Sequence, residues 1–413
     1  MIDTIQLHTY ALRAERELRG NILPFWIQHT VDMERGGFYG GISNDLHVDL
    51  EAPKGALLTT RILWAYAAAY RRYQEAEYLV MAQMAYADLI DRFWDHAHGG
   101  LYWAVSPTGE PLQPHKQIFV QAYGIYALAE YALATGSRYA LDRAIALHRL
   151  IEAHASDALH GGYREACAAD WQPHQAALDA ASASAEKTFN THLHVLEAYA
   201  NLLRSWNSPE LRTRLAALID LIASRMIDRD SAHARHFFTN DFTPLPGPLS
   251  FGHDIEASWL LLDAAHELGD RALLARVEPL ALAMADAVYA QGLGGDGALP
   301  YESDWQGNIV QAQREWWPQT EAVVGFLRAY CASGEPHFLE AALRCWEFIE
   351  QRLVDRAGGE WFKAVTPEGE PLRDEAKVSF WKCPYHNTRA CLEMVARLQQ
   401  INQSSVLQIS RGE

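Results

Sequence analysis

Histidine, arginine, tryptophan and carboxylate side chains recur where apolar, helix-like segments of the sequence begin. The segment FGHDIEASWLLLDAA at 251–265 starts with His253, Asp254 and Glu256 and then becomes apolar. The helix dipole favours acids near a helix N-terminus, so one such segment needs no functional explanation. Six segments share the pattern, however. The side chains at or near their starts form a candidate site: Arg61, Tyr123, Asn190, His192, His194, His253, Glu256, Trp317, Glu321, Trp381, His386 and Arg389.

Two histidines with an arginine are suited to moving a proton on a carbon atom beside a carbonyl group. Histidine titrates near neutral pH and can both accept and return a proton. Arginine stays charged and can hold the oxygen of an enediolate as negative charge develops. Tryptophans clustered at a polar rim provide faces on which sugar rings stack. This chemistry requires no redox cofactor.

Other kinds of site are less well supported. His192 and His194 are two residues apart, so they point in different directions on a helix, and without an HExxH motif we expect no metal. The sequence contains no GxSxG elbow, phosphate loop or GxGxxG fingerprint, so we expect no bound cofactor. Glycoside hydrolysis needs two facing carboxylates, which Glu256 and Glu321 could supply, and this alternative stays open.

A recurring loop motif precedes these segments. GGLYWAVSPTGEPL at 99–112 closely resembles GGEWFKAVTPEGEPL at 358–372. Glycines supply left-handed turns and aromatic pairs suit short strands, so each loop is expected to form a small β-hairpin. Shorter versions of the motif occur at 36–45, 161–166 and 294–304, and 235–245 keeps only the aromatic pair.

The spacing of the six segments predicts the fold. One marker from each segment (Arg61, Tyr123, His192, His253, Trp317 and His386) gives steps of 62, 69, 61, 64 and 69 residues. A period of about 65 residues accommodates two helices and a long loop. Between the loops lie amphipathic segments such as 77–94, which suit outer helices. We therefore predict an all-α fold, an (α/α)6 barrel with short β-hairpin loops at the active-site mouth. We expect one catalytic domain over 1–403 and a flexible tail over 404–413.

The motifs resemble those of the N-acylglucosamine 2-epimerase superfamily, and most closely its cellobiose 2-epimerase branch. The resemblance runs nearly end to end. It is carried by GGFYG, TTRILWAY, NTHLHVLEAY, SFGHDIEASWLL, WWPQTEAVVGF and SFWKCPYHNTRA. Together these motifs are highly specific, and the family's fold is also an (α/α)6 barrel.

The resemblance implies inversion at C2 of a reducing glucose or mannose unit without a cofactor. The sugar ring opens, the C2 proton leaves to give an enediolate, the C2–C3 bond rotates, and C2 is reprotonated on the opposite face. By motif matching, His253 and His386 are the acid–base pair, Arg61 holds the O1/O2 side, and His194 assists ring opening or binds the oxygen. The same matching assigns substrate binding to Tyr123, Asn190, Glu256, Trp317, Glu321 and Trp381.

Composition limits the partners and the compartment. The chain has 413 residues and a formal net charge of −17, which argues against binding to nucleic acid or anionic membranes. Its five cysteines show no CxxC spacing and fit free thiols in a reducing compartment. The charged N-terminus lacks a signal-peptide h-region, and no apolar run is long enough to span a membrane. We expect a cytoplasmic monomer that acts on a small sugar.

The sequence favours epimerisation of cellobiose to glucosyl-mannose, with lactose as a second substrate. Within the same class, the alternative is a mannose 2-epimerase or a mannose–fructose isomerase. From other classes, the rivals are the glycosidase with Glu256 and Glu321 and a sugar-binding barrel without catalysis. The preferred sugar and the balance between epimerisation and isomerisation are not determined by the sequence.

Overall fold

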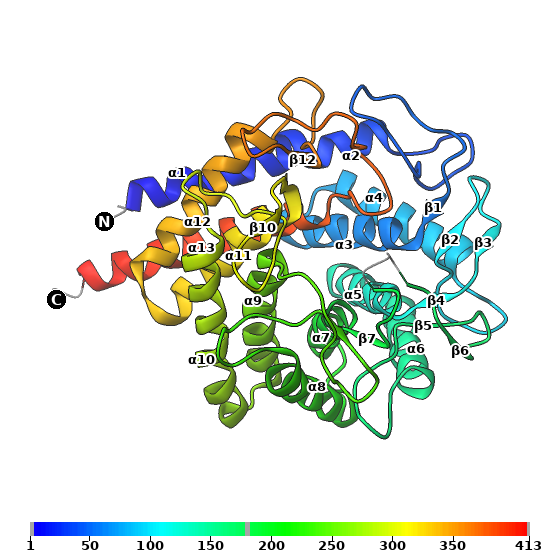
Figure 1. Cartoon of the computed structure of the whole chain (residues 1–413). Helices are drawn as coiled ribbons and strands as arrows, with labels where there is room; N and C mark the ends of the chain where they lie inside the picture. The colour runs from blue at the N-terminus through cyan, green and yellow to red at the C-terminus, as the bar shows by residue number, and fades with distance from the viewer. Residues whose placement is uncertain (1–3, 178–181, 411–413) are drawn as a thin grey trace.

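Twelve long helices form two concentric layers in the computed structural model of the chain, which describes residues 4–177 and 182–410, with side chains up to residue 403 (Figure 1). The inner helices are α3 (Ala56–Tyr73), α5 (Ile118–Thr135), α7 (Phe189–Leu203), α9 (Phe251–Leu268), α11 (Trp316–Ser333) and α13 (Tyr385–Ser410). The outer helices are α1 (Thr4–Glu17), α4 (Ala76–Asp88), α6 (Arg138–His154), α8 (Pro209–Leu221), α10 (Arg271–Ala287) and α12 (Pro336–Phe348).

The inner helices close into a ring. Each packs against the next along the chain, and α13 returns to pack against α3. The outer helices pack on the inner ring, with α8 resting on both α7 and α9 and with α1 on α13, so the N-terminal helix covers the last inner helix. The predicted (α/α)6 barrel is confirmed.

Hydrophobic pattern explains which helices lie inside. In α5, every residue from Ile118 to Ala132 is buried, as expected for a helix that is covered on all sides. In α6, buried residues occur at Ala140, Ala144, Leu147 and Ile151, which is one face of a helix. Glycines in the left-handed conformation end α5, α9 and α11.

Short π-helical stretches extend most outer helices toward the loops. They are η1 (Leu18–Ile22), η2 (Leu89–Phe93), η3 (Ile222–Met226), η4 (Val288–Gly292) and η5 (Ile349–Leu353). The first of them leads into the short helix α2 (Leu23–His29). The outer element expected at 77–94 is therefore α4 followed by η2.

The loops between outer and inner helices carry short antiparallel strands, as the glycine and aromatic motifs predict. The strands pair in the orders β1-β2-β3, β4-β5-β6, β7-β8, β10-β9 and β11-β12. The pairs β1-β2, β4-β5, β7-β8 and β11-β12 join neighbouring loops around the barrel, whereas β2-β3, β5-β6 and β10-β9 are hairpins within one loop. The strands are β1 (Lys54–Gly55), β2 (Ala104–Val105), β3 (Pro111–Gln113), β4 (Lys116–Gln117), β5 (Ala166–Cys167), β6 (Pro173–His174), β7 (Lys187–Thr188), β8 (Phe237–Phe238), β9 (Glu302–Ser303), β10 (Ile309–Gln311), β11 (Arg314–Glu315) and β12 (Ala364–Val365).

Buried ion pairs fix four of these loops. In each, an aspartate just after an outer helix accepts backbone N–H groups of its own turn through one oxygen and a lysine Nζ through the other. The lysine lies shortly before an inner helix, so the pair ties the loop to the start of that helix. The pairs are Asp32–Lys54, Asp95–Lys116, Asp157–Lys187 and Asp355–Lys377, with O···N distances of 2.9, 2.8, 2.7 and 2.5 Å.

The C-terminal helix α13 crosses the boundary expected between the domain at 1–403 and the tail at 404–413. Helix α13 runs through residue 404, where the tail was predicted to begin, and residues 411–413 lie outside the described residues. The division into a domain and a tail stays a prediction. All five cysteines are unpaired, and four of them are buried. No helix in the described part of the chain combines the length and apolar composition that a membrane span requires.

Candidate active site

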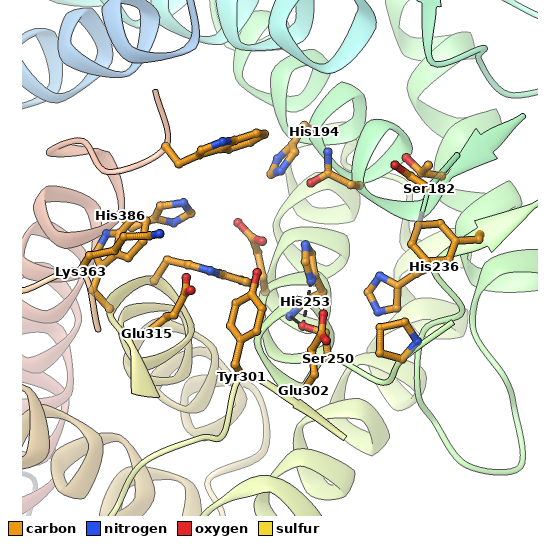
Figure 2. A pocket seen from close by; sticks show the side chains of 18 of the residues that line it. Ser182, His194, His236, Ser250, His253, Tyr301, Glu302, Glu315, Lys363 and His386 are labelled. Atoms are coloured by element: carbon orange, nitrogen blue, oxygen red, sulfur yellow. Dashed lines mark hydrogen bonds between the residues drawn. The ribbon is translucent and has the colours of Figure 1, made fainter. Parts of the chain in front are cut away.

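A cavity of about 380 Å³ opens where the inner helices begin (Figure 2). Five inner helices each contribute a lining side chain from their first two turns: α3, α7, α9, α11 and α13. Eight of the residues predicted for the site line this cavity: Arg61, Asn190, His194, His253, Glu256, Trp317, Trp381 and His386. The other four predicted residues lie outside the lining. Of these, Tyr123, Glu321 and Arg389 hydrogen-bond to side chains of the lining, whereas His192 bonds to backbone groups.

His386 is held from behind by a carboxylate. Its Nδ1 lies 2.7 Å from Oε1 of Glu321, which has no exposed surface. Trp259 Nε1 donates to the other oxygen of Glu321 at 3.1 Å. Burial and the nearby charge of Arg61 lower the pKa of His386 well below its usual value. His386 is therefore neutral at pH 7.

His253 has a different partner. Its Nδ1 lies 2.9 Å from Oγ of Ser250, the residue that caps the N-terminus of α9 (Figure 2). The ring of Trp317 meets the imidazole edge-on, with centroids 4.7 Å apart. Burial and the neighbouring His236 lower the pKa of His253 well below its usual value, so this ring is also neutral at pH 7.

Arg61 lies between aromatic rings at the inner side of the cavity. Its Nη2 donates to the hydroxyl of Tyr123 at 2.8 Å, and its guanidinium carbon lies 4.4 Å from the centroid of that ring. The Tyr123 hydroxyl is also 3.2 Å from Nδ1 of His194. The same Nδ1 lies 3.1 Å from Oε2 of Glu197. Arg61, Tyr123, His194 and Glu197 thus form one continuous polar chain.

Arg389 connects this chain to the rest of the site. Its guanidinium donates to Glu197, to Glu256 at 3.0 Å and to Glu321 at 2.7 Å. Burial raises the pKa of Glu256 well above its usual value, and the charge of Glu321 adds to the effect. Burial opposes ionisation of Glu197 as well, but the charge of Arg389 together with the contacts of His194 and Tyr385 outweighs it and lowers the pKa of that carboxyl.

The same contacts bear on the glycosidase alternative. Glu256 and Glu321 both bind one nitrogen of Arg389, and only Glu256 lines the cavity. A glycosidase needs two carboxyl groups on opposite sides of a scissile bond. The structure places this pair side by side on one nitrogen of Arg389, with Glu321 outside the lining, which disfavours hydrolysis.

The arrangement also bears on metal binding. Glu256, Glu321 and His386 offer ligand atoms within 4.8 Å of one another, the one such group of three among the described residues. However, Arg389 donates to both carboxylates, and Nδ1 of His386 already bonds to Glu321. A guanidinium thus supplies the positive charge that a metal ion would bring.

Two of the predicted side chains, those of His192 and Trp381, differ from the others in their surroundings. His192 is buried outside the cavity, where its Nδ1 bonds to the Thr188 carbonyl at 2.7 Å and its Nε2 accepts the Tyr163 N–H at 3.0 Å. It is a structural residue. Trp381 lines the cavity and is 41% exposed, and its ring stacks on Phe119 with centroids 6.2 Å apart.

Sequence reasoning missed several site residues that come from the loops. The additional lining residues include His236, Ser250, Tyr301, Glu302, Glu315 and Lys363 (Figure 2). Burial raises the pKa of Glu315 to about 7, although the charge of Lys363 opposes the shift. Glu197 was also missed, and its position three residues after His194 on a helix was the available signal.

The predicted family can now be compared with known proteins. The sequence profile of the N-acylglucosamine 2-epimerase (GlcNAc 2-epimerase) family matches residues 37–390. The chain belongs to this family. A cellobiose 2-epimerase from Bacteroides fragilis is 42% identical over 382 residues, which are 92% of this chain and 97% of that protein. The predicted cellobiose 2-epimerase branch is thereby confirmed.

Solved structures agree with this placement. Cellobiose 2-epimerase from Bacillus thermoamylovorans has a TM-score of 0.90 and 40% identity, covering 94% of this chain and 100% of that chain. A D-mannose isomerase has a TM-score of 0.80 and 21% identity, covering 93% of this chain and 97% of that chain. At that identity, the second likeness concerns the fold alone.

Proposed function

We propose that this protein is a cellobiose 2-epimerase, which interconverts the reducing-end glucose of cellobiose with mannose and also accepts lactose. The observation that carries the proposal is a cavity in which two neutral histidines, His253 and His386, share the lining with Arg61. Neutral imidazoles can accept a proton from carbon, and a buried guanidinium can stabilise an enediolate oxygen. The cellobiose 2-epimerases among the relatives support the choice of substrate.

The reaction follows from the contacts of each group. With the sugar ring open, C1 is a carbonyl and the C2 proton is acidic. A histidine removes that proton, and its electron pair moves into an enediolate whose oxygens lie against Arg61. Rotation about C2–C3 and return of a proton to C2 give the epimer, with no net change in protons or electrons. His194, which contacts Tyr123 and Glu197, is placed to assist ring opening.

The other predicted residues support binding. Asn190 and Glu256 are polar groups of the lining, and Trp317 presents an aromatic surface beside His253. Glu321 orients His386 through its hydrogen bond. Trp381, half-exposed at the cavity, is placed to stack on the sugar beyond the reacting one. No metal or organic cofactor enters this scheme.

The test is incubation of the protein with cellobiose in deuterated water. We expect glucosyl-mannose that carries deuterium at C2, because the removed proton exchanges on an imidazole. Released glucose would instead indicate a glycosidase, a fructose-terminated product an isomerase, and unchanged cellobiose a binding protein. An epimer with no deuterium at C2 would contradict exchange of the C2 proton with solvent.

We also propose that the protein acts as a cytoplasmic monomer. The closed ring of inner helices, with outer helices packed around it, needs no second copy to complete the described cavity. The unpaired cysteines suit a reducing compartment. Light scattering during size-exclusion chromatography will test the oligomeric state.

A further inference from the structure

The partners of the two histidines differ in what they can donate. A carboxylate accepts hydrogen bonds only, whereas a serine hydroxyl both donates and accepts. Glu321 receives donors from Trp259 and Arg389 as well as from His386, so both of its oxygens act as acceptors. Nδ1 of His386 must therefore carry a hydrogen.

Ser250 differs from Glu321 because its hydroxyl can donate a hydrogen bond to the histidine. Its Oγ is the N-cap acceptor for the backbone N–H of His253, at 3.4 Å. Oγ has a second lone pair, so this bond alone does not fix the direction of the contact with the imidazole. Among the described residues, however, the one hydrogen-bond acceptor for the Oγ hydrogen is Nδ1 of His253, 2.9 Å away. Nδ1 of His253 therefore holds a lone pair, and the nitrogen on the far side of the ring, Nε2, carries the hydrogen.

The outer nitrogens of both rings are available to substrate. Both residues line the cavity, and no hydrogen bond to either Nε2 occurs among the described residues. The hydrogen bond made by one ring nitrogen sets the protonation of the other. Both rings thus present Nε2 to the sugar, but the different partners at Nδ1 leave a lone pair on one Nε2 and a hydrogen on the other.

We propose that the two histidines are held in opposite neutral tautomers, with His386 presenting a lone pair and His253 an N–H to the substrate, and that Ser250 is the positioning residue that sets the second. This inference rests on the proposed function and divides the roles of the acid–base pair. His386 is the base, and His253 is a hydrogen-bond donor to the enediolate oxygen.

Protons balance in this scheme with one base. The C2 proton passes to Nε2 of His386, the C–H electron pair enters the enediolate, and Glu321 stabilises the resulting imidazolium. His253 donates a hydrogen bond to the developing oxyanion and keeps its proton. Rotation about C2–C3 then presents the other face of C2 to His386, which returns a proton and becomes neutral again.

The first experiment measures the tautomers without turnover. In protein labelled with ¹⁵N-histidine at pH 7, long-range ¹H–¹⁵N spectra distinguish protonated from unprotonated ring nitrogens, and His253→Gln and His386→Gln assign the signals. We expect hydrogen on Nε2 of His253 and on Nδ1 of His386. Hydrogen on Nδ1 of His253 would overturn the proposal. Because this measurement needs no activity, failure to epimerise cellobiose would count only against the proposed function.

The second experiment tests the role of Ser250. Ser250→Ala should shift His253 away from the Nε2–H tautomer and lower kcat on cellobiose roughly tenfold with little change in KM. Ser250→Thr keeps the hydroxyl and should restore both. The matched control is Ser137→Ala, which removes the N-cap of α6 at a similar distance of 3.3 Å but contacts no histidine. An unchanged His253 tautomer in Ser250→Ala would overturn the assigned role.

A separate isotope experiment tests whether His386 is the single base. With cellobiose deuterated at C2 and ordinary water as solvent, a single base returns part of the deuterium to C2 of the epimer. Deuterium in the product at low conversion is the expected result. A product with only solvent hydrogen at C2 would overturn the single-base scheme, even if the tautomers are as proposed.

Discussion

Trp381 provides a test of why a disaccharide would be preferred to a single sugar. Reaction at C2 involves only the reducing sugar, so the second ring contributes through binding alone. One face of Trp381 stacks on Phe119, and the side chain is 41% exposed at the cavity. We predict that Trp381→Ala lowers kcat/KM for cellobiose and has little effect on mannose.

The size of the effect follows from the exposed area. A tryptophan has at most about 250 Å² of surface to bury, so 41% exposure leaves roughly 100 Å² available. A sugar ring on the open face covers about half of that area, which at about 25 cal/mol per Å² contributes roughly 1.2 kcal/mol. Since about 1.4 kcal/mol corresponds to a factor of ten, kcat/KM for cellobiose should fall roughly eightfold.

The assay compares initial rates on cellobiose and on mannose for the wild-type protein and two variants. Trp381→Phe keeps an aromatic face and should retain most of the cellobiose activity. Circular dichroism will check that Trp381→Ala is folded. Equal losses on both sugars would place Trp381 at the reacting unit and refute the stacking argument.

Three further predictions follow from the site and the loops. His386→Ala should lower kcat roughly 10²–10⁴-fold, as expected for an acid–base group, and His253→Ala roughly 10²–10³-fold, as expected for loss of a donor to the enediolate oxygen; near-normal turnover would remove that histidine from the mechanism. Dialysis against EDTA should leave the epimerisation rate unchanged because Arg389 already neutralises the carboxylates that could bind a metal, and activity restored by a divalent ion would contradict this. Lys187→Met should lower the free energy of unfolding at pH 7 by on the order of 3 kcal/mol, because it leaves the Asp157 carboxylate without its partner. Burial opposes the shift, but Lys187 and backbone N–H groups lower the folded-state pKa of Asp157 to about 2. Since the unfolded value is about 3.9, the stabilisation is present above pH ~4 and is lost as the pH falls toward 2. In urea unfolding, the difference between wild type and Lys187→Met should therefore shrink as the pH falls from 7 toward 2. The part due to the lost hydrogen bonds to the Gly161 and Asn240 carbonyls should persist, and a constant difference would contradict the assignment.

The sequence by itself determined the number of repeats and the order of their elements. Helical periodicity, glycine turns and aromatic pairs are local signals, because they depend on neighbours within a few residues. They were sufficient to predict six helix pairs with hairpins between them. They also placed Arg61, His253 and His386 near the starts of inner helices, where the cavity lies.

The tertiary structure decided which of these groups face one another and what state they are in. His192 and His194 are two residues apart, yet only His194 reaches the cavity, because Thr188 and Tyr163 hold His192 behind it. Nothing near Glu197 in sequence indicates that it binds Arg389, since closure of the ring brings α7 and α13 together across 192 residues.

The charge states also depend on closure. Burial lowers the pKa values of His253 and His386, and burial is a property of the packed barrel rather than of either segment. The hydrogen-bond partners of the two rings differ in this respect, because Ser250 is three residues from His253, whereas Glu321 lies 65 residues from His386. Local sequence could thus name the reacting groups and place Ser250 beside His253, but only long-range packing could bury both rings and bring Glu321 to His386.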